Sequence, residues 1–270
     1  MNRADFIVVG GGIAGLSAAA ALARHGKAVV IEAEAALGYH ASGRSATFSH
    51  YGIGNHAVRA LTAWSRDRFE PGVAVRAPAL FIATEEMLET LASLEAAMAR
   101  FSDRLERVGE ARMQALFPPL RTGPGAALAG CLDRDGLRLD ADAMLQGHAR
   151  AIRRAGGAVL MGRRVAAVAP GWTVTAATGE AWQAPVLVNA AGAWADGLAR
   201  LAGVAPLGLR PLRRTIVVVE PPAGADIRSW PFVKTAADDD EVGAVHGLPN
   251  SSKSRPSRAA TIRALALPSP

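Results

Sequence analysis

Apolar and polar positions alternate along the chain in a way that predicts strands and helices in turn. Near the N-terminus, Phe6–Val9 is a short continuous apolar run, which predicts a buried strand. Leu16–Arg24 is rich in alanine and contains no helix breaker, so it predicts a helix. A second apolar run, Ala28–Ile31, predicts a second strand. Strand, helix and strand in this order predict an α/β fold with a mostly parallel sheet.

The remaining pattern predicts further helices separated by short strands. The predicted helices cover Asn55–Phe69, Glu85–Val108, Glu110–Phe117, Ala195–Ala202 and a segment from the N-cap Asp140 to Ala155, which Gly156 and Gly157 close. The predicted strands cover Pro78–Thr84, Arg164–Val168, Trp172–Thr175, Pro185–Asn189 and Arg214–Glu220. We find no internal repeat.

The first strand enters a glycine-rich turn with the spacing of a dinucleotide-binding fingerprint. Gly10 allows the tight turn, Gly12 lets the backbone approach a pyrophosphate, and Gly15 lets helix and strand pack closely. The phosphates then lie at the helix N-terminus, where N–H groups and the helix dipole favour negative charge. Glu32 ends the second strand about twenty residues later, where a carboxylate accepts from a ribose 2′-hydroxyl. The combination therefore predicts a nucleotide site.

A small polar loop, Gly38–Ser45, follows the second strand and contains Arg44. Its hydroxyl and amide groups and the arginine charge suit a pyrophosphate. An ordinary solvated turn explains the same composition equally well.

Composition and charge narrow the class of protein. The 270 residues are 50% hydrophobic and 20% charged, enough for one large domain or one and a half. The net charge of +6 comes from scattered arginines without interleaved aromatics, so we expect no nucleic-acid partner. Residues 6–23 carry no charge, but their three consecutive glycines argue against a membrane span or signal peptide. The single cysteine, Cys131, fits a reducing cytoplasm, and no metal is expected.

Four motifs, taken in order, resemble the D-amino-acid oxidase family of FAD-dependent oxidoreductases. They are the fingerprint ending in Glu32, the S-G-R-S loop at 42–45, the V-L-V-N-A-A-G-A-W run at 186–194, and A-P-L-G-L-R-P-L-R-R at 205–214. Within the family, Gly38-Tyr39-His40 ahead of this loop is most similar to D-arginine dehydrogenases. The resemblance covers residues 4 to about 236.

The resemblance implies a Rossmann-like FAD domain with a mostly parallel sheet and an incomplete substrate domain with a mixed sheet. It assigns 1–75 and 137–205 to the FAD domain, 76–136 and 206–236 to the substrate domain, and 237–270 to a tail. It also implies a set of FAD-binding positions. These are Gly10, Gly12, Ile13, Ala14, Gly15, Glu32, Ala33, Ser42, Gly43, Arg44, Ser45, Val165, Ala191, Gly192 and Trp194. For Trp194, a core aromatic at a helix start is the simpler interpretation.

The implied chemistry is hydride transfer from the α-carbon of a D-amino acid to flavin N5, followed by hydrolysis of the imine. A bidentate arginine suits the substrate carboxylate, and Arg213 or Arg214 stands in the family's position for it. A tyrosine and a histidine of the substrate site follow the G-R-S loop in D-arginine dehydrogenases. Tyr51 matches the tyrosine, whereas Phe48 or His50 takes the place of the histidine, and His50 is otherwise a solvated loop residue.

The C-terminal sequence departs from the sequence pattern of the family. After about Ala237 an acidic run, 238–241, precedes a tail, 251–270, with four basic residues and no helical or strand period. Such a sequence is expected from a shifted reading frame or from a natural disordered tail.

Three functions follow from the sequence. The first is a D-amino-acid dehydrogenase or oxidase acting on a small amino acid or amine with an unknown electron acceptor, with glycine or sarcosine oxidation as a variant. The second is an FAD- or ADP-binding remnant without turnover. The third, an NAD-dependent enzyme, leaves the G-R-S and N-A-A-G-A-W motifs unexplained.

Overall fold

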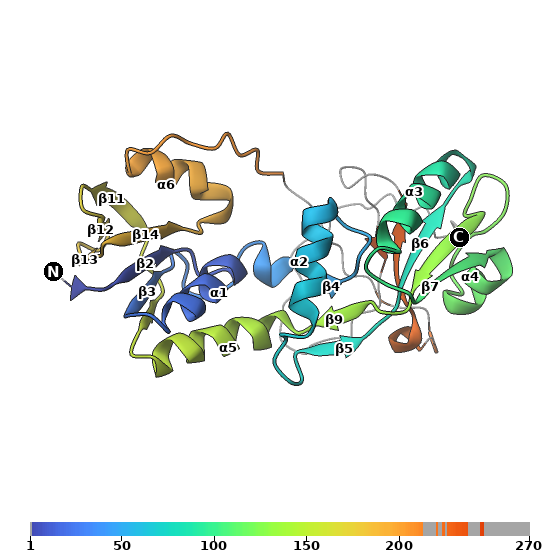
Figure 1. The fold of residues 1–270 in the computed structure, drawn as a ribbon, viewed down its shortest axis with the longest axis horizontal. Coiled ribbons are helices and arrows are strands. Elements are labelled where there is room, and N and C mark those ends of the chain that lie inside the picture. Colours follow the sequence, from blue (N-terminus) through green and yellow to red (C-terminus); the bar gives the residue numbers. More distant parts are fainter. Residues whose placement is uncertain (1, 213–219, 221–222, 225, 237–243, 246–270) are drawn as a thin grey trace. The chain divides into compact units, whose positions relative to one another are not determined.

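The computed structural model describes residues 2–212, 220, 223–224, 226–236 and 244–245 (Figure 1). The chain folds into two units, each built from two separate stretches of sequence. Unit 1 comprises Met1–Ala46 and Asp140–Arg214, and unit 2 comprises Thr47–Leu139 and Thr215–Pro270. Both units combine helices with sheets, so the predicted mixed α/β class is confirmed.

A four-stranded parallel sheet forms the centre of unit 1. Its order is β10 (Ala158–Leu160), β3 (Ala28–Ile31), β2 (Phe6–Val9) and β14 (Val186–Asn189). The strands predicted at 6–9 and 28–31 are confirmed, and the one predicted from Pro185 begins one residue later. Continuous apolar runs suit these strands because layers cover both faces of the sheet.

Two helices cover one face of this sheet. Helices α1 (Ile13–Leu22) and α5 (Ala141–Arg154) pack beside each other, and their buried residues meet Val8 and Val30 of the sheet (Figure 1). The predicted N-cap of α5 is confirmed, since the Asp140 carboxylate accepts a hydrogen bond from the Ala143 amide at 2.9 Å.

A second sheet covers the other face and completes the core of unit 1. Ile7 and Val9, one position out of phase with Val8, point into this second core with Val174 and Trp182. Its strands, in spatial order, are β1 (Asn2–Arg3), β13 (Ala181–Gln183), β12 (Thr173–Ala176) and β11 (Val165–Ala169). The 3-10 turn η3 (Gly192–Trp194) and helix α6 (Ala195–Leu201) follow β14.

Unit 2 is built on a mixed five-stranded sheet. Its order is β16 (Ala244–Val245), β15 (Phe232–Thr235), β6 (Ala79–Ala83), β8 (Ala129–Asp133) and β7 (Leu105–Gly109). Strands β15 and β6 run parallel, whereas the other neighbouring pairs are antiparallel. Alternate residues face two cores, one with helix α3 (Leu88–Met98) and one with helix α4 (Glu110–Leu116).

A smaller sheet and further short elements complete unit 2. The small sheet has the order β4 (Phe48–Ser49), β9 (Leu137–Leu139) and β5 (Ala74–Arg76). Helix α2 (His56–Arg66) follows β4 and is capped by Asn55, whose side chain accepts from the Val58 amide at 3.1 Å. The 3-10 turns are η1 (Ser42–Arg44) in unit 1, and η2 (Glu85–Met87) and η4 (Ile227–Ser229) in unit 2.

The single helix predicted over 85–108 is wrong. Helix α3 ends at Met98, and Leu105–Gly109 forms strand β7 instead. Leu105 and Val108 have helical spacing, but β7 pairs along its whole length with β8 and buries Val108 against Met113. This long-range pairing outweighs the local helical preference.

Candidate functional site

The turn between β2 and α1 has a shape that glycine alone permits. Gly10 has a φ of +117°, and a Cβ atom there would lie 2.2 Å from the Ala190 carbonyl oxygen. A Cβ atom on Gly15 would lie 1.9 Å from the Gly10 carbonyl oxygen. At this turn main chain therefore packs directly against main chain, with no room for a side chain between them.

The N-terminus of α1 receives its cap from a distant loop. The N-cap residue Gly12 offers no side chain, and the Ser42 hydroxyl accepts a hydrogen bond from the Ile13 amide at 2.9 Å. The Gly38 amide donates to the Gly11 carbonyl at 3.0 Å, and the Gly43 amide donates to the Gly38 carbonyl at 2.7 Å. The 38–45 loop is therefore ordered against the fingerprint and is not a free turn.

Glu32 lies beside the glycine turn at the end of β3. Its carboxylate accepts hydrogen bonds from the amides of Gly11, at 2.5 Å, and Glu34, at 2.8 Å. Because a carboxylate has about four acceptor positions, these two bonds leave capacity for hydroxyl donors. Ala33 follows Glu32 directly in the chain, just after the end of β3.

The segment that leads to Val165 runs beside Glu32. The Arg163 amide donates to the Glu32 carbonyl at 2.8 Å, and the Gly162 amide donates to the Glu34 carbonyl at 2.8 Å. Val165 then begins β11, where the register with β12 shifts. The structure thus brings the start of β11 to the same edge as the candidate ribose acceptor.

The second glycine-containing turn follows β14 and carries Ala191, Gly192 and Trp194. Trp194 is 51% exposed, so its interpretation as a core aromatic is wrong. Leu198, four residues further on in α6, is the residue that packs into the core of unit 1. The indole ring lies 4.5 Å, centroid to centroid, from the His40 ring, which connects this turn to the 38–45 loop.

Side chains of the 38–45 loop contact one another and Glu34. His40 Nε2 lies 3.1 Å from Glu34 Oε1, and the Arg44 guanidinium lies 5.3 Å from the centre of the Tyr39 ring. Ser45 follows η1 in extended conformation. The fingerprint, Glu32, this loop and the Ala191–Trp194 turn together form one cradle at the carboxyl edge of a parallel sheet, the usual place for a dinucleotide.

The comparison with protein families gives the family of the chain and its cofactor. Residues 5–252 match the model of the family described as FAD dependent oxidoreductase, DAO, so the chain belongs to that family. Its cofactor is FAD. The residues fit this cofactor. A Cβ atom at Gly10 or Gly15 would overlap the backbone, so both positions carry no side chain. The main-chain amides of the turn can then face a pyrophosphate.

Several solved structures share the fold. They include an L-α-glycerophosphate oxidase from Mycoplasma pneumoniae with FAD bound, with a TM-score of 0.65, 20% identity, and coverage of 75% of this chain and 58% of that one. A glycine oxidase from Geobacillus kaustophilus has a TM-score of 0.61, 20% identity and coverage of 75% and 59%. An L-proline dehydrogenase from P. horikoshii has a TM-score of 0.68, 19% identity and coverage of 87% and 64%. The chain thus spans less than two thirds of each of these structures.

The described residues contain neither a membrane-spanning helix nor a cluster of metal-ligating side chains. No helix there has the length and hydropathy needed to cross a bilayer. Nor does that part of the chain gather three or more histidine, cysteine or acidic side chains suited to a metal ion.

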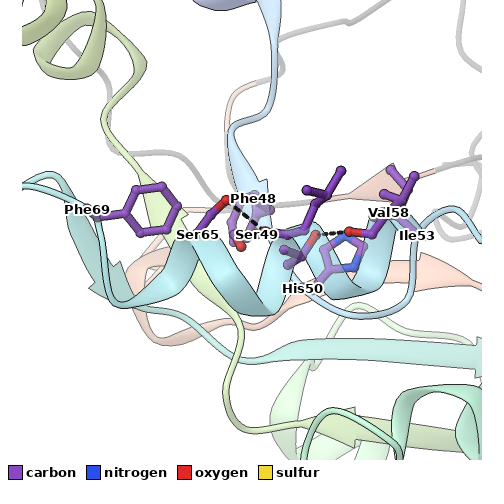
Figure 2. Close-up of a pocket in the computed structure, with 9 residues that line it drawn as sticks. Phe48, Ser49, His50, Ile53, Val58, Ser65 and Phe69 are labelled. Carbon is purple, nitrogen blue, oxygen red and sulfur yellow. Dashed lines mark hydrogen bonds between the residues drawn. The ribbon is translucent and has the colours of Figure 1, made fainter. Parts of the chain in front are cut away.

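His50 lies in unit 2, at a cavity of about 300 Å³. It is only 4% exposed and lies between aromatic rings, 5.3 Å from Phe81 and 5.2 Å from Phe232, so the solvated loop interpretation is wrong. Its Nδ1 accepts a hydrogen bond from the Gly52 amide at 3.2 Å. Phe48, the alternative residue for the histidine's place, lines the same cavity, whose side chains gather along one face of α2 (Figure 2).

Tyr51 points into the core of unit 2. Its ring stacks on Phe101 at 5.9 Å, and the Arg66 guanidinium lies 5.2 Å from its centre. Burial raises the pKa of the Tyr51 phenol, and the Arg66 charge opposes that rise. The phenol is therefore neutral at physiological pH and acts as a hydrogen-bond donor or acceptor.

The remaining predicted catalytic residues, Arg213 and Arg214, lie outside the described residues, as do most of the predicted strand 214–220 and the whole tail 251–270. Cys131 is buried in β8, and burial raises the pKa of its thiol to about 12, so it is not a nucleophile.

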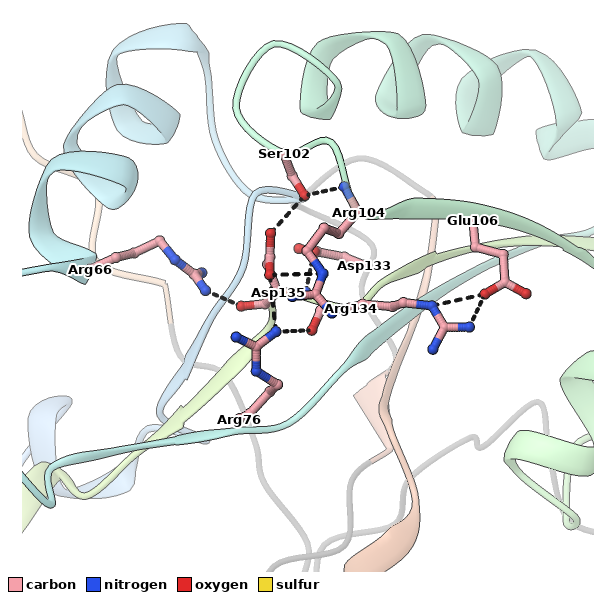
Figure 3. Close-up of polar contacts among 8 residues, drawn as sticks. All are labelled: Arg66, Arg76, Ser102, Arg104, Glu106, Asp133, Arg134 and Asp135. Atoms are coloured by element: carbon pink, nitrogen blue, oxygen red, sulfur yellow. Dashed lines mark hydrogen bonds and ion pairs between the residues drawn. The ribbon is translucent and has the colours of Figure 1, made fainter.

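Asp133 and Asp135 belong to a polar cluster with several arginines (Figure 3). The Tyr51 amide also donates a hydrogen bond to the Asp133 carboxyl. Asp133 is fully buried in β8, and this burial raises the pKa of its carboxyl. Hydrogen bonds from the Asp135 and Tyr51 amides oppose the rise in pKa. Asp135 is more exposed and lies 3.2 Å from Arg76 and 3.7 Å from Arg104. The two carboxyls therefore lie in different environments, one buried and one beside arginine side chains.

We expect Asp133→Asn to flatten the pH dependence of stability. Because the pKa of Asp133 is raised in the folded state, its contribution is fully present below the unfolded pKa of about 4 and is lost as the pH rises through the folded pKa. The asparagine stays neutral, so the free energy of unfolding should fall less as the pH rises above about 4. Denaturant unfolding at several pH values measures this.

The matched control is Asp135→Asn, which removes ion pairs with Arg76 and Arg104. These pairs are partly exposed, so we expect a loss of only about 0.5 to 1 kcal/mol at neutral pH. A steeper pH dependence in Asp133→Asn than in the unmodified chain would contradict the assignment.

Proposed function

We propose that this chain is an FAD-dependent oxidoreductase that oxidises the Cα–N bond of an amino acid, with D-amino acids preferred. The observation that supports it most is the glycine turn, where added Cβ atoms would overlap the backbone, with Glu32 hydrogen-bonded beside it. The G-R-S loop, ordered against that turn, adds the feature by which the sequence resembles D-arginine dehydrogenases. The segments of unit 1 then form the FAD domain, and those of unit 2 belong to the substrate domain.

In this proposal the residues of unit 1 hold the cofactor. The amides after Gly12 and the Ser42 hydroxyl bind the pyrophosphate, and Arg44 supplies positive charge. Glu32 accepts from the adenosine ribose, the Val165 backbone contacts the adenine, and the Ala191–Gly192 backbone passes close to the cofactor.

Bound FAD supplies the hydride acceptor. The chain's own residues must hold the substrate carboxylate and align its α-hydrogen, and Arg213 or Arg214 is the proposed carboxylate partner. His50 lines a cavity of unit 2 with an imidazole fixed by the Gly52 amide, which suits a positioning role. Tyr51 supports the same segment from within the core.

We expect Glu32→Ala to weaken FAD and ADP binding by about 10- to 100-fold, since a hydrogen bond to a charged acceptor contributes about 1.5 to 3 kcal/mol. The substitution also removes the acceptor of the Gly11 and Glu34 amides, which loosens the turn. Calorimetric titration with ADP and FAD measures the effect. The affinity of Glu32→Gln is expected to lie between those of Glu32→Ala and the unmodified chain. Equal binding of NADP and FAD by the unmodified chain would contradict the ribose assignment.

The substrate class is tested by mixing the FAD-loaded chain with amino acids in the absence of oxygen. Loss of flavin absorbance faster with D-amino acids than with their L-enantiomers supports the proposal. Faster loss with glycine or sarcosine supports the glycine-oxidase variant instead. Tight FAD binding with no loss of absorbance for any amine shows a binding remnant.

A further inference from the structure

Two segments of unit 1 flank the glycine turn from opposite sides. The parallel sheet has the order β10, β3, β2 and β14, so β3 and β14 both neighbour the strand that delivers the turn. The 38–45 loop follows β3, and the Ala191–Trp194 turn follows β14. Neighbouring strands lie about 5 Å apart, so the two segments leave the sheet about 10 Å apart, one on each side of the fingerprint.

One side chain from each of these segments reaches across to the other. The His40 and Trp194 rings lie 4.5 Å apart, centroid to centroid, with 52° between their planes. Their contact therefore bridges the end of β2, where the glycine turn begins. Both rings are partly exposed, Trp194 at 51%, so the contact adds little to the apolar core of unit 1.

A chain of polar contacts fixes the ring on the loop side. His40 Nε2 lies 3.1 Å from Glu34 Oε1, and Arg164 Nη2 lies 3.5 Å from the same oxygen. The Glu34 amide donates to the Glu32 carboxylate at 2.8 Å. The imidazole is thus held by a side chain that is itself anchored beside the candidate ribose acceptor.

Asn189, the last residue of β14, fixes the ring on the turn side. Its side-chain amide donates to the Ala195 carbonyl at 2.7 Å, and its side-chain oxygen accepts from the Ala191 amide at 3.3 Å. Asn189 thereby braces both ends of the segment that carries Trp194. The indole therefore extends from a turn whose backbone is held independently of the ring contact.

From this placement we infer that His40 and Trp194 form a latch across the FAD cradle, which must open for the cofactor to enter or leave. Because other hydrogen bonds hold the backbones of the loop and the turn, opening requires only rotation of the two side chains. The latch then sets the rates of FAD binding and release. This inference rests on the FAD site of the family and not on the substrate of the proposed reaction.

Stopped-flow measurement of FAD exchange tests the latch. Binding is followed after mixing the cofactor-free chain with FAD, and release after displacing bound FAD with excess ADP. In Trp194→Ala both rates should rise by about 2- to 10-fold, the factor expected for loss of one aromatic ring contact. Trp194→Phe keeps a ring and should restore most of the unmodified rates. Trp64→Ala, at a 61% exposed tryptophan of unit 2, is the matched control and should change neither rate.

A double-mutant cycle separates a latch from two independent contacts. Because His40 and Trp194 share one contact, combining His40→Asn with Trp194→Ala should give rates no faster than those of Trp194→Ala alone. Multiplied effects of the two substitutions would overturn the inference, as would unchanged rates in either single variant. Faster release without faster binding would also overturn it, since Trp194 would then contact FAD without blocking its path.

The melting temperature of the cofactor-free variants separates a latch from a purely structural contact. It should match that of the unmodified chain, because both rings are partly exposed and outside the core. A fall in melting temperature in parallel with faster release would overturn the inference. None of these measurements needs turnover, so failure of the latch and failure of the proposed amino-acid oxidation are distinguishable.

Discussion

Replacing Gly15 by alanine is expected to abolish FAD binding and to destabilise unit 1. The new Cβ atom would lie 1.9 Å from the Gly10 carbonyl oxygen, so α1 must move away from the strand that delivers the turn. Such overpacking costs about 1 to 3 kcal/mol. The displaced amides would also lose their hydrogen bonds to the pyrophosphate, each about 1.5 to 3 kcal/mol, which corresponds to about 100-fold weaker binding or more. Titration with FAD and denaturant unfolding measure the two effects.

Gly197 provides the matched control for Gly15. It also lies inside a helix of unit 1, α6, but a Cβ atom there would meet nothing within 4 Å. Because alanine favours a helix over glycine by about 1 kcal/mol, Gly197→Ala should be neutral or stabilising and should bind FAD normally. Equal effects of Gly15→Ala and Gly197→Ala on FAD binding and stability would contradict the role of close packing at the glycine turn.

The nucleotide cradle was predictable because most of it is local in sequence. Between Phe6 and Glu32, the strand boundaries, the turn and the acid all follow from neighbouring residues, and β2 and β3 form where predicted. The distance from Ser42 to the α1 N-terminus was not predictable in the same way. It depends on a hydrogen bond across 29 residues that no local pattern specifies.

Long-range packing explains where the sequence prediction failed. Leu105 and Val108 have helical spacing, yet β8 pairs with their segment. His50 and Trp194 were assigned the opposite environments from those they have. The burial of His50 depends on Phe81 and Phe232, which are distant in sequence.

Replacing Phe81 by alanine is expected to unfold unit 2 selectively. Phe81 is fully buried in β6, its ring lies 5.3 Å from His50, and it leaves no room for a side chain at Gly52. Removing a buried phenyl ring costs about 3 to 5 kcal/mol, the loss of its transfer energy plus that of the cavity left behind. The segment from His50 to Gly54 would lose its support, and the cavity that it lines would lose its shape.

Because Phe81 belongs to unit 2, ADP binding by unit 1 should survive this substitution even where unit 2 unfolds. Denaturant unfolding, with an ADP titration on the same sample, separates the two effects. Leu61→Ala, at a 64% exposed position of α2, is the control and should change the free energy of unfolding by less than about 0.5 kcal/mol. Loss of ADP binding in Phe81→Ala in parallel with the unfolding of unit 2 would contradict this selectivity.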